Sequence, residues 1–139
     1  MPRGARILAV LTIAAVMAGC SKNSVATAET GVKAFHDRFN AEQYEDIYSQ
    51  AAATFRTQAS HEKFQNTMTN MHAKLGLVRS SKIANSDVSW RLGGSYVHLT
   101  AETEFEHAQG KEEFLWRVKG SDAVLMGYNI NAKHAGAAE

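Results

Sequence analysis

The spacing of apolar residues changes once along this chain, at Gly76, and this change constrains the fold more than any other feature. Before Gly76, apolar side chains recur every three or four residues, which is the period of one helical face. After Gly76 they alternate with polar side chains, which is the period of a strand with one buried face. Helices followed by strands predict an α+β domain, in which the helices pack on an antiparallel sheet.

Three helices are expected before Gly76. The apolar stripes that mark them are Val25, Ala28, Val32, Phe35 and Phe39 for the first, Tyr44, Ile47, Tyr48 and Ala51 for the second, and Phe64, Met68, Met71 and Leu75 for the third. Ser60 is a suitable N-cap for the third helix. Gly76 is a suitable residue at its C-terminal end, because glycine adopts a left-handed backbone conformation there without strain.

Four strands are expected after Gly76, joined by the turns Gly93-Gly94, Gln109-Gly110 and Gly120-Ser121. The first would run from Leu77 to Leu92, with a bulge at Ala84-Asn85-Ser86, and the fourth from Ala123 to Ile130. The side chains expected on the inner face are Val88, Trp90, Val97, Leu99, Ala101, Thr103, Phe105, Phe114, Trp116 and Val118. The predicted fold is therefore three N-terminal helices packed on a curved four-stranded antiparallel sheet.

One pair of side chains suggests chemistry. With the turn at Gln109-Gly110, Phe105 faces Phe114, and His107 faces Glu112 at the rim of the sheet. A carboxylate beside an imidazole orients the ring and raises its basicity, which is how acid–base pairs are built. The same two residues could equally form a solvated pair at a strand end. They are the catalytic candidates of this sequence, and no catalytic motif accompanies them.

Four apolar residues are expected on the outer face of the sheet, away from the helices: Leu115, Val124, Met126 and Tyr128. An exposed apolar patch is typical of an interface, so we expect a homodimer through this face. A longer loop or the C-terminal tail could cover the patch instead. No metal or cofactor is expected, because His61 and His72 stand about 16 Å apart on one helix and no phosphate or dinucleotide motif is present.

The first twenty residues have the pattern of an export signal. Arg3 and Arg6 precede an apolar run over residues 7–17, which is too short to cross a bilayer of about 30 Å. The run ends in Met17-Ala18-Gly19-Cys20, which resembles the lipobox of bacterial lipoproteins, although that family prefers leucine where Met17 stands. The resemblance implies cleavage before Cys20, diacylglycerol on its thiol and a fatty acid such as palmitate on its amine. Ser21 implies the outer membrane, facing the periplasm.

This interpretation divides the chain into a signal peptide (1–19), an acylated cysteine with a short tether (20–28), an α+β domain (29–132) and a flexible tail (133–139). Removing 19 of 139 residues leaves 120, with 13 basic and 14 acidic side chains. No run of basic residues remains, so the acyl chains alone are expected to hold the membrane. The near-neutral charge also excludes a dedicated nucleic-acid binder. A single cysteine excludes an internal disulfide.

The order of elements is similar to that of the nuclear transport factor 2-like cone fold. The segments that carry the resemblance are Phe39-Asn40-Ala41-Glu42-Gln43-Tyr44, Ile47-Tyr48, Phe55, Phe64, Lys74-Leu75-Gly76 and Phe114-Leu115-Trp116-Arg117-Val118, which look like small envelope proteins of this superfamily. The resemblance implies a pocket at the open end of the cone. The residues that we expect to line it are Tyr44, Tyr48, Trp90, Thr103, Phe105, Phe114 and Trp116.

These observations predict a membrane-anchored envelope lipoprotein that binds a partner protein or a small ligand without catalysis. One alternative is a small enzyme of the isomerase or hydratase kind, with its pocket at the open end of the cone. Another is a structural envelope protein with a filled cone and no pocket. The enzyme and the binding module differ in one feature of the site. An enzyme of this kind needs an unpaired acid or base inside an apolar cavity, whereas a binding module does not.

Overall fold

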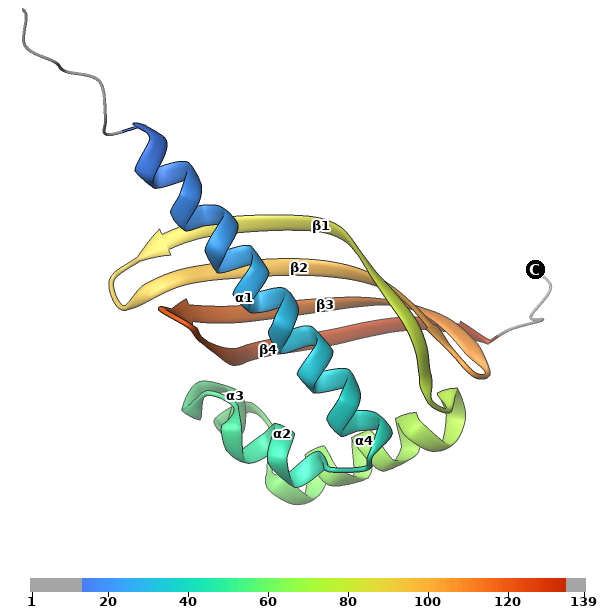
Figure 1. The fold of residues 1–139 in the computed structure, drawn as a ribbon. Helices are drawn as coiled ribbons and strands as arrows, with labels where there is room; N and C mark the ends of the chain where they lie inside the picture. Colours follow the sequence, from blue (N-terminus) through green and yellow to red (C-terminus); the bar gives the residue numbers. More distant parts are fainter. Residues whose placement is uncertain (1–13, 135–139) are drawn as a thin grey trace, which may run out of the picture.

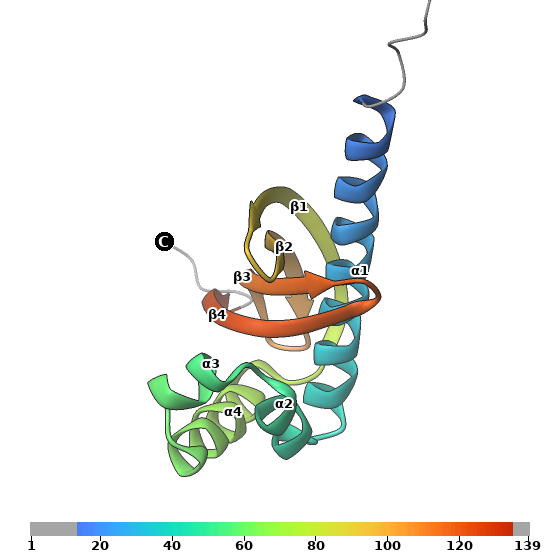
Figure 2. The same ribbon diagram turned by 90° about the vertical axis from the view of Figure 1, so that its left-hand side faces the viewer.

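The computed structural model of the protein describes residues 14–134, with side chains from Lys22 onward. Its elements, in chain order, are α1 (Ala14–Asn40), α2 (Tyr44–Gln50), α3 (Ala53–Gln58), α4 (His61–Leu75), β1 (Val78–Arg91), β2 (Gly94–Phe105), β3 (Ala108–Lys119) and β4 (Asp122–His134). The strands form one antiparallel sheet in the order β1-β2-β3-β4. The sheet is strongly bent, with α1 crossing its inner face and the shorter helices at one end (Figures 1 and 2). The predicted α+β class is confirmed.

Helix α1 begins well before the apolar stripe that predicted it. Residues 21–28, expected as an extended tether, are helical and already belong to the domain. Ala28 is fully buried, and the buried Ser24 donates from its Oγ to Ser95 Oγ on β2 at 3.2 Å. Residues 1–13 of the proposed signal peptide lie outside the described part of the chain, as do residues 135–139 of the expected tail.

Within residues 14–134, four helices and not three precede the sheet. The extended backbone at Ala51 and Ala52 separates α2 from α3, because the N–H of Ala52 donates to the carbonyl of Leu125 on β4 at 2.9 Å. The predicted ends of the last helix are confirmed. Ser60 Oγ accepts from the N–H of Lys63, and Gly76 has φ +78°.

The turns of the sheet differ from the prediction at two of three places. The first turn is Leu92-Gly93, one residue early, and the second is Glu106-His107, three residues early. The turn at Gly120-Ser121 is confirmed. In the pairing of β2 with β3, the numbers of two paired residues therefore add up to 213, as in Leu99 with Phe114, whereas the predicted turn required a sum of 219. Each β2 residue thus pairs with a β3 residue six positions earlier than predicted. Because six is an even number, the side chains of β2 and β3 keep their predicted faces.

The second turn forms at Glu106-His107 because its backbone is hydrogen-bonded to the C-terminal end of α4 and to the residues just after it. The N–H of Glu106 donates to the carbonyl of Leu77, and the N–H of His107 to that of Leu75, both at 2.9 Å. Gly110 instead lies within β3, beneath the side chains of Phe105 and Ile130. The alternation of apolar and polar residues along the strands does not indicate these contacts with the end of α4.

The core lies between α1 and the inner face of the sheet. The predicted inner residues of β2 are all buried, as are Phe114, Trp116 and Val118 of β3. Trp116 lies against Gly31 of α1, where an added Cβ would come within 3.0 Å of the indole ring. The two predicted inner residues of β1 are less covered, since Val88 is only partly buried and Trp90 is exposed. Trp90 pairs with Ser95 on the inner face but lies beyond the core, and 52% of its surface is exposed.

Candidate functional site

A carboxylate is buried in the centre of the domain. Glu112 alternates with Phe114 and Trp116 on the inner face of β3, and only 1% of its surface is exposed. Burial of a carboxylate is costly unless hydrogen bonds compensate it. The residues that surround Glu112 come from every strand of the sheet and from α1.

Three donors reach the two oxygens of Glu112. His36 Nε2 lies 2.8 Å from Oε1, and Thr103 Oγ1 donates to the same oxygen at 2.5 Å. The hydroxyl of Tyr128 donates to Oε2 at 2.5 Å. Ser81 Oγ lies 2.8 Å from Thr103 Oγ1. Since the single hydroxyl proton of Thr103 goes to Glu112, Ser81 must be the donor in that contact.

A bulge in β4 is what brings Tyr128 to this network. Leu115 pairs with Gly127 and Trp116 with Leu125, so Met126 is an extra residue in β4. The extra residue reverses the alternation of inward and outward side chains along β4. Leu125, before the bulge, and Tyr128, after it, therefore both face the core. The prediction that Tyr128 lies on the outer face is therefore wrong. Gly127 was the available signal, since glycine inside a strand often marks a bulge.

The second residue that the sequence analysis missed is His36. It shares the buried stripe of α1 with Val32 and Phe39, at spacings of four and three residues. Its ring lies edge-on to Phe35 and Phe114, at centroid distances of 6.0 and 5.9 Å. A histidine on the apolar stripe of a helix requires a buried partner, and that requirement was the signal for a carboxylate on the sheet.

The environment of Tyr128 keeps its phenol protonated. Burial raises the pKa of Tyr128 well above its ordinary value of about 10, and the charge of Glu112 and the hydrogen bond to it raise it further. Tyr128 therefore remains a hydrogen-bond donor throughout the physiological pH range. The rings of Phe35 and Phe114 pack against it at 4.7 and 5.0 Å.

The carboxylate of Glu112 is enclosed within this network. Both oxygens of Glu112 accept hydrogen bonds from the protein, and aromatic rings cover the remaining sides. Neither the hollow on the outer face of the sheet nor the hollow beside Ser24 and Trp90 is lined by His36, Glu112 or Tyr128. A carboxylate in this arrangement fixes α1 to the sheet. It offers no free oxygen to a substrate.

The pairing of His107 with Glu112 is wrong. His107 lies in the exposed turn between β2 and β3, and Glu112 pairs across the strands with Ala101. The shift of six residues described above is the cause, because it moves the turn from Gln109-Gly110 to Glu106-His107. Glu112 keeps its inward orientation, but its partner is a histidine of α1.

The residues expected to line a pocket are not gathered around one. Phe105, Phe114 and Trp116 are core residues, and Tyr48 donates to the carbonyls of Arg56 and Ala59 at 3.1 and 2.9 Å. Thr103 belongs to the Glu112 network, whereas the exposed Trp90 lies at the far end of the sheet. Tyr44 is buried, and neither its hydroxyl nor Nε2 of the neighbouring His72 has a hydrogen-bond partner within residues 14–134. Burial raises the pKa of Tyr44, and the nearby charge of Glu42 adds to this.

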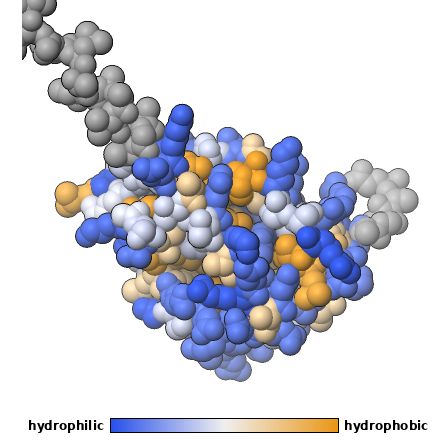
Figure 3. All heavy atoms as spheres, in the orientation of Figure 1, coloured by the Kyte–Doolittle hydropathy of each residue, from blue (hydrophilic) through white to orange (hydrophobic). Residues whose placement is uncertain are grey.

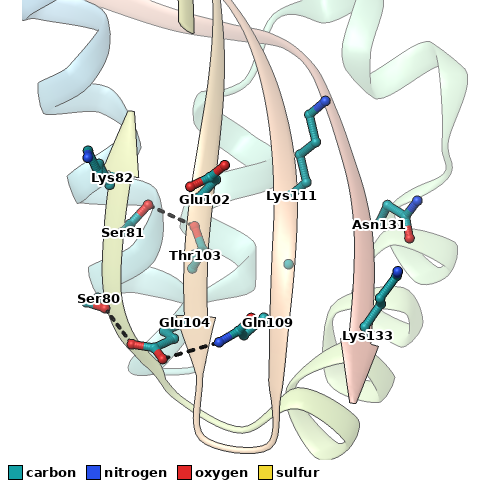
Figure 4. Close-up of a pocket in the computed structure, with 11 residues that line it drawn as sticks. Ser80, Ser81, Lys82, Glu102, Thr103, Glu104, Gln109, Lys111, Asn131 and Lys133 are labelled. Carbon is teal, nitrogen blue, oxygen red and sulfur yellow. Dashed lines mark hydrogen bonds between the residues drawn. The ribbon is translucent and has the colours of Figure 1, made fainter. Parts of the chain in front are cut away.

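The outer face of the sheet carries a groove of about 680 Å³, which we call the outer groove. Its lining residues are Ser80, Ser81, Lys82, Glu102, Thr103, Glu104, Gln109, Gly110, Lys111, Asn131 and Lys133. Eight of them form two rows across all four strands, Lys82-Glu102-Lys111-Asn131 and Ser80-Glu104-Gln109-Lys133 (Figure 4). Three lysines and two glutamates make the groove polar and of mixed charge. Ser81 and Thr103 connect it to the buried network.

The outer apolar patch is smaller than predicted. Leu115, Val124 and Met126 are partly buried, and Tyr128 faces inward. Across the described residues, no group of three metal-binding side chains occurs. No helix among them is long and apolar enough to cross a bilayer.

Residues 32–128 match the model of a protein family described as a protein of unknown function, DUF4019. Because the match covers well over half of the chain, the protein belongs to this family. The matched region includes His36, Thr103, Glu112 and Tyr128, and ends before Asn131 and Lys133 of the outer groove. A search of curated proteins found no match.

Proposed function

We propose that this protein is an envelope lipoprotein, acylated on Cys20, whose domain is a non-catalytic binding module. The outer groove is its binding site. The observation that carries the proposal is this groove, which spans all four strands with charges of both signs. Its chemistry suits a polar ligand, or a polar segment of a partner protein, that presents both donors and acceptors.

The buried network supports a binding role over an enzymatic one. An enzyme of the isomerase or hydratase kind requires an acid or base that reaches its substrate. Glu112 and His36 instead contact each other in the core at 2.8 Å, and Thr103 and Tyr128 complete the hydrogen bonds of Glu112. The geometry therefore does not favour the enzyme alternative.

The proposal includes the cone architecture of the nuclear transport factor 2-like superfamily. A bent antiparallel sheet with helices on its inner face supports this assignment (Figure 1). The core replaces the pocket that the resemblance implied, since Phe39, Phe114 and Leu99 are buried there. Binding is therefore assigned to the outer face of the sheet and not to the interior of the cone.

Anchoring through Cys20 is tested by fractionation of the native host. The variant Cys20→Ser should leave the membrane fraction, because no other residue can take the diacylglycerol group. Mass spectrometry of the wild-type protein should show the acyl chains, with the chain beginning at Cys20. An unchanged membrane fraction for Cys20→Ser would contradict the lipoprotein assignment.

Binding in the outer groove is tested by native mass spectrometry of the full protein, extracted gently from its own host. We expect additional mass on the wild-type protein and its loss in Lys111→Glu, which reverses a charge in the middle of a row. Lys63→Glu on α4 makes the same chemical change away from the groove and should retain the mass. Equal retention by both variants would exclude the groove as the site.

A further inference from the structure

One end of the molecule carries apolar side chains that nothing in the described structure covers. We call it the hairpin end, and it contains the β1–β2 turn, the β3–β4 turn and the N-terminal part of α1 (Figure 1). Leu92 occupies the first of these turns with its whole surface exposed, and Trp90 lies two residues earlier with 52% of its surface exposed. Apolar atoms protrude from this side of a largely hydrophilic surface (Figure 3).

Three exposed cations, Lys22, Arg91 and Lys119, lie in the segments that form this end. Arg91 and Lys119 line one hollow with Trp90, and Asp122 pairs with Lys119. The guanidinium of Arg91 lies 5.0 Å from the ring centroid of Tyr96. These cations are far apart in the sequence, which is why no basic run predicted them. Folding brings them to the same end as Trp90 and Leu92.

Helix α1 places Cys20 at the same end. A hollow of about 510 Å³ is lined by Asn23 and Ser24 of α1 together with Trp90 and Arg91 at the end of β1 and Lys119 at the end of β3. Cys20 lies about one helical turn before Asn23, roughly 5 Å along the axis. Since α1 is continuous from Ala14 to Asn40, no flexible segment separates Cys20 from the domain.

We propose that the hairpin end docks on the surface of a phospholipid bilayer, with Leu92 and Trp90 entering the headgroup region. This inference rests on the proposed function, because the acyl chains on Cys20 would hold this end at the membrane. Tryptophan favours the membrane–water interface, where its ring is partly apolar and its N–H meets polar groups. Lys22, Arg91 and Lys119 would contact lipid phosphates while their aliphatic stems lie along the apolar layer.

The bilayer fits the hairpin end better than a protein does. Leu92 stands in the β1–β2 turn and Trp90 near the end of β1, where Arg91 and Lys119 line the same hollow. Exposed apolar side chains beside cations are the pattern of an interfacial anchor. The outer groove lies at the other end of the strands, with Thr103 ten residues after Gly93, or about 30 Å along an extended strand. Docking through the hairpin end therefore leaves the groove facing away from the lipid.

Tryptophan fluorescence tests the docking on the full acylated protein. It is reconstituted into vesicles of phosphatidylcholine and phosphatidylglycerol that contain a lipid brominated near the headgroup. Trp90→Phe is the matched control, because it leaves Trp116, which is only 5% exposed in the core. We expect the wild type to lose several-fold more fluorescence than Trp90→Phe, and the variant Leu92→Asp to lose less than the wild type.

Several outcomes would overturn the docking. One is equal quenching of wild type and Trp90→Phe in vesicles that retain the protein, and another is full access of aqueous iodide to Trp90 there. A photo-crosslinker at position 92 that captures a protein and not lipid in the native envelope would assign this end to a partner. These results are distinct from failure of the lipoprotein assignment, which mass spectrometry of Cys20 decides independently of fluorescence.

Discussion

At the scale of residues, Glu112 shows how much of the core depends on a few polar contacts. Its three donors come from α1, β2 and β4, and Thr103 connects it further to Ser81 on β1. A buried carboxylate is tolerated only while these donors remain. Tyr44, Tyr48 and Tyr128 are all at least partly buried, and their hydroxyls have different surroundings: no partner among the described residues for Tyr44, backbone carbonyls for Tyr48 and Glu112 for Tyr128. They therefore form a natural comparison.

The variant Tyr128→Phe should be less stable than the wild type by about 2–3 kcal/mol, because Glu112 loses a hydrogen bond to a charged, buried oxygen. The variant Tyr44→Phe should be neutral or more stable by a few tenths of a kcal/mol, since its hydroxyl has no partner within residues 14–134. Urea unfolding of the three proteins measures both differences. Equal destabilisation by the two substitutions would show that Glu112 does not depend on Tyr128.

The raised pKa of Tyr128 predicts a loss of stability in alkali. In the unfolded chain this tyrosine releases its proton near pH 10, whereas in the folded protein it retains the proton to higher pH. The unfolded state then binds fewer protons, so the free energy of unfolding falls as the pH rises above 10. Urea unfolding between pH 8 and 11 should show a smaller decline for Tyr128→Phe. An identical decline would contradict the raised pKa.

At the scale of elements, the sequence predicts periodicity better than register. The change of period at Gly76, the stripe of α1 and the burial of alternate β2 residues are local properties, and all are confirmed. The β2–β3 turn depends on contacts of Glu106 and His107 with the end of α4, which local pattern does not contain. The Glu112 network was missed for the same reason. It needs both the bulge at Met126 and a histidine from a distant helix.

The junction between α4 and β1 can be tested by substituting Gly76, which lies there, with Gly120 of the β3–β4 turn as the control. Both Gly76 and Gly120 have positive φ, at +78° and +60°. An added Cβ at Gly76 would lie 2.7 Å from Cβ of Glu106, whereas at Gly120 it would meet nothing within 4 Å. Gly120→Ala should therefore cost only the backbone strain, about 1–2 kcal/mol. Gly76→Ala should cost clearly more, because the turn must also move. Thermal unfolding of the two variants measures the difference, and equal costs would contradict the close contact.

At the scale of the whole molecule, the fold separates two surfaces. The hairpin end carries Trp90, Leu92 and cations beside the start of α1, and the outer groove lies toward the opposite end of the same strands. The Glu112 network lies between them and holds α1 against the sheet. The proposed membrane-docking end and the proposed ligand groove therefore do not overlap on the domain.

The continuity of α1 has a rotational consequence. A helix turns about 100° and rises about 1.5 Å for each residue. The rotational position of Cys20 about the axis of α1 therefore sets the direction in which the whole domain points relative to Cys20. One alanine inserted between Cys20 and Ser24 would swing the two strand turns about 100° around the helix axis. Seven inserted residues would bring the strand turns back to within about 20° of their original direction, with the domain about 10 Å farther from Cys20 along the helix axis. The number of residues between Cys20 and the buried Ser24 thus sets the direction in which the domain points relative to Cys20.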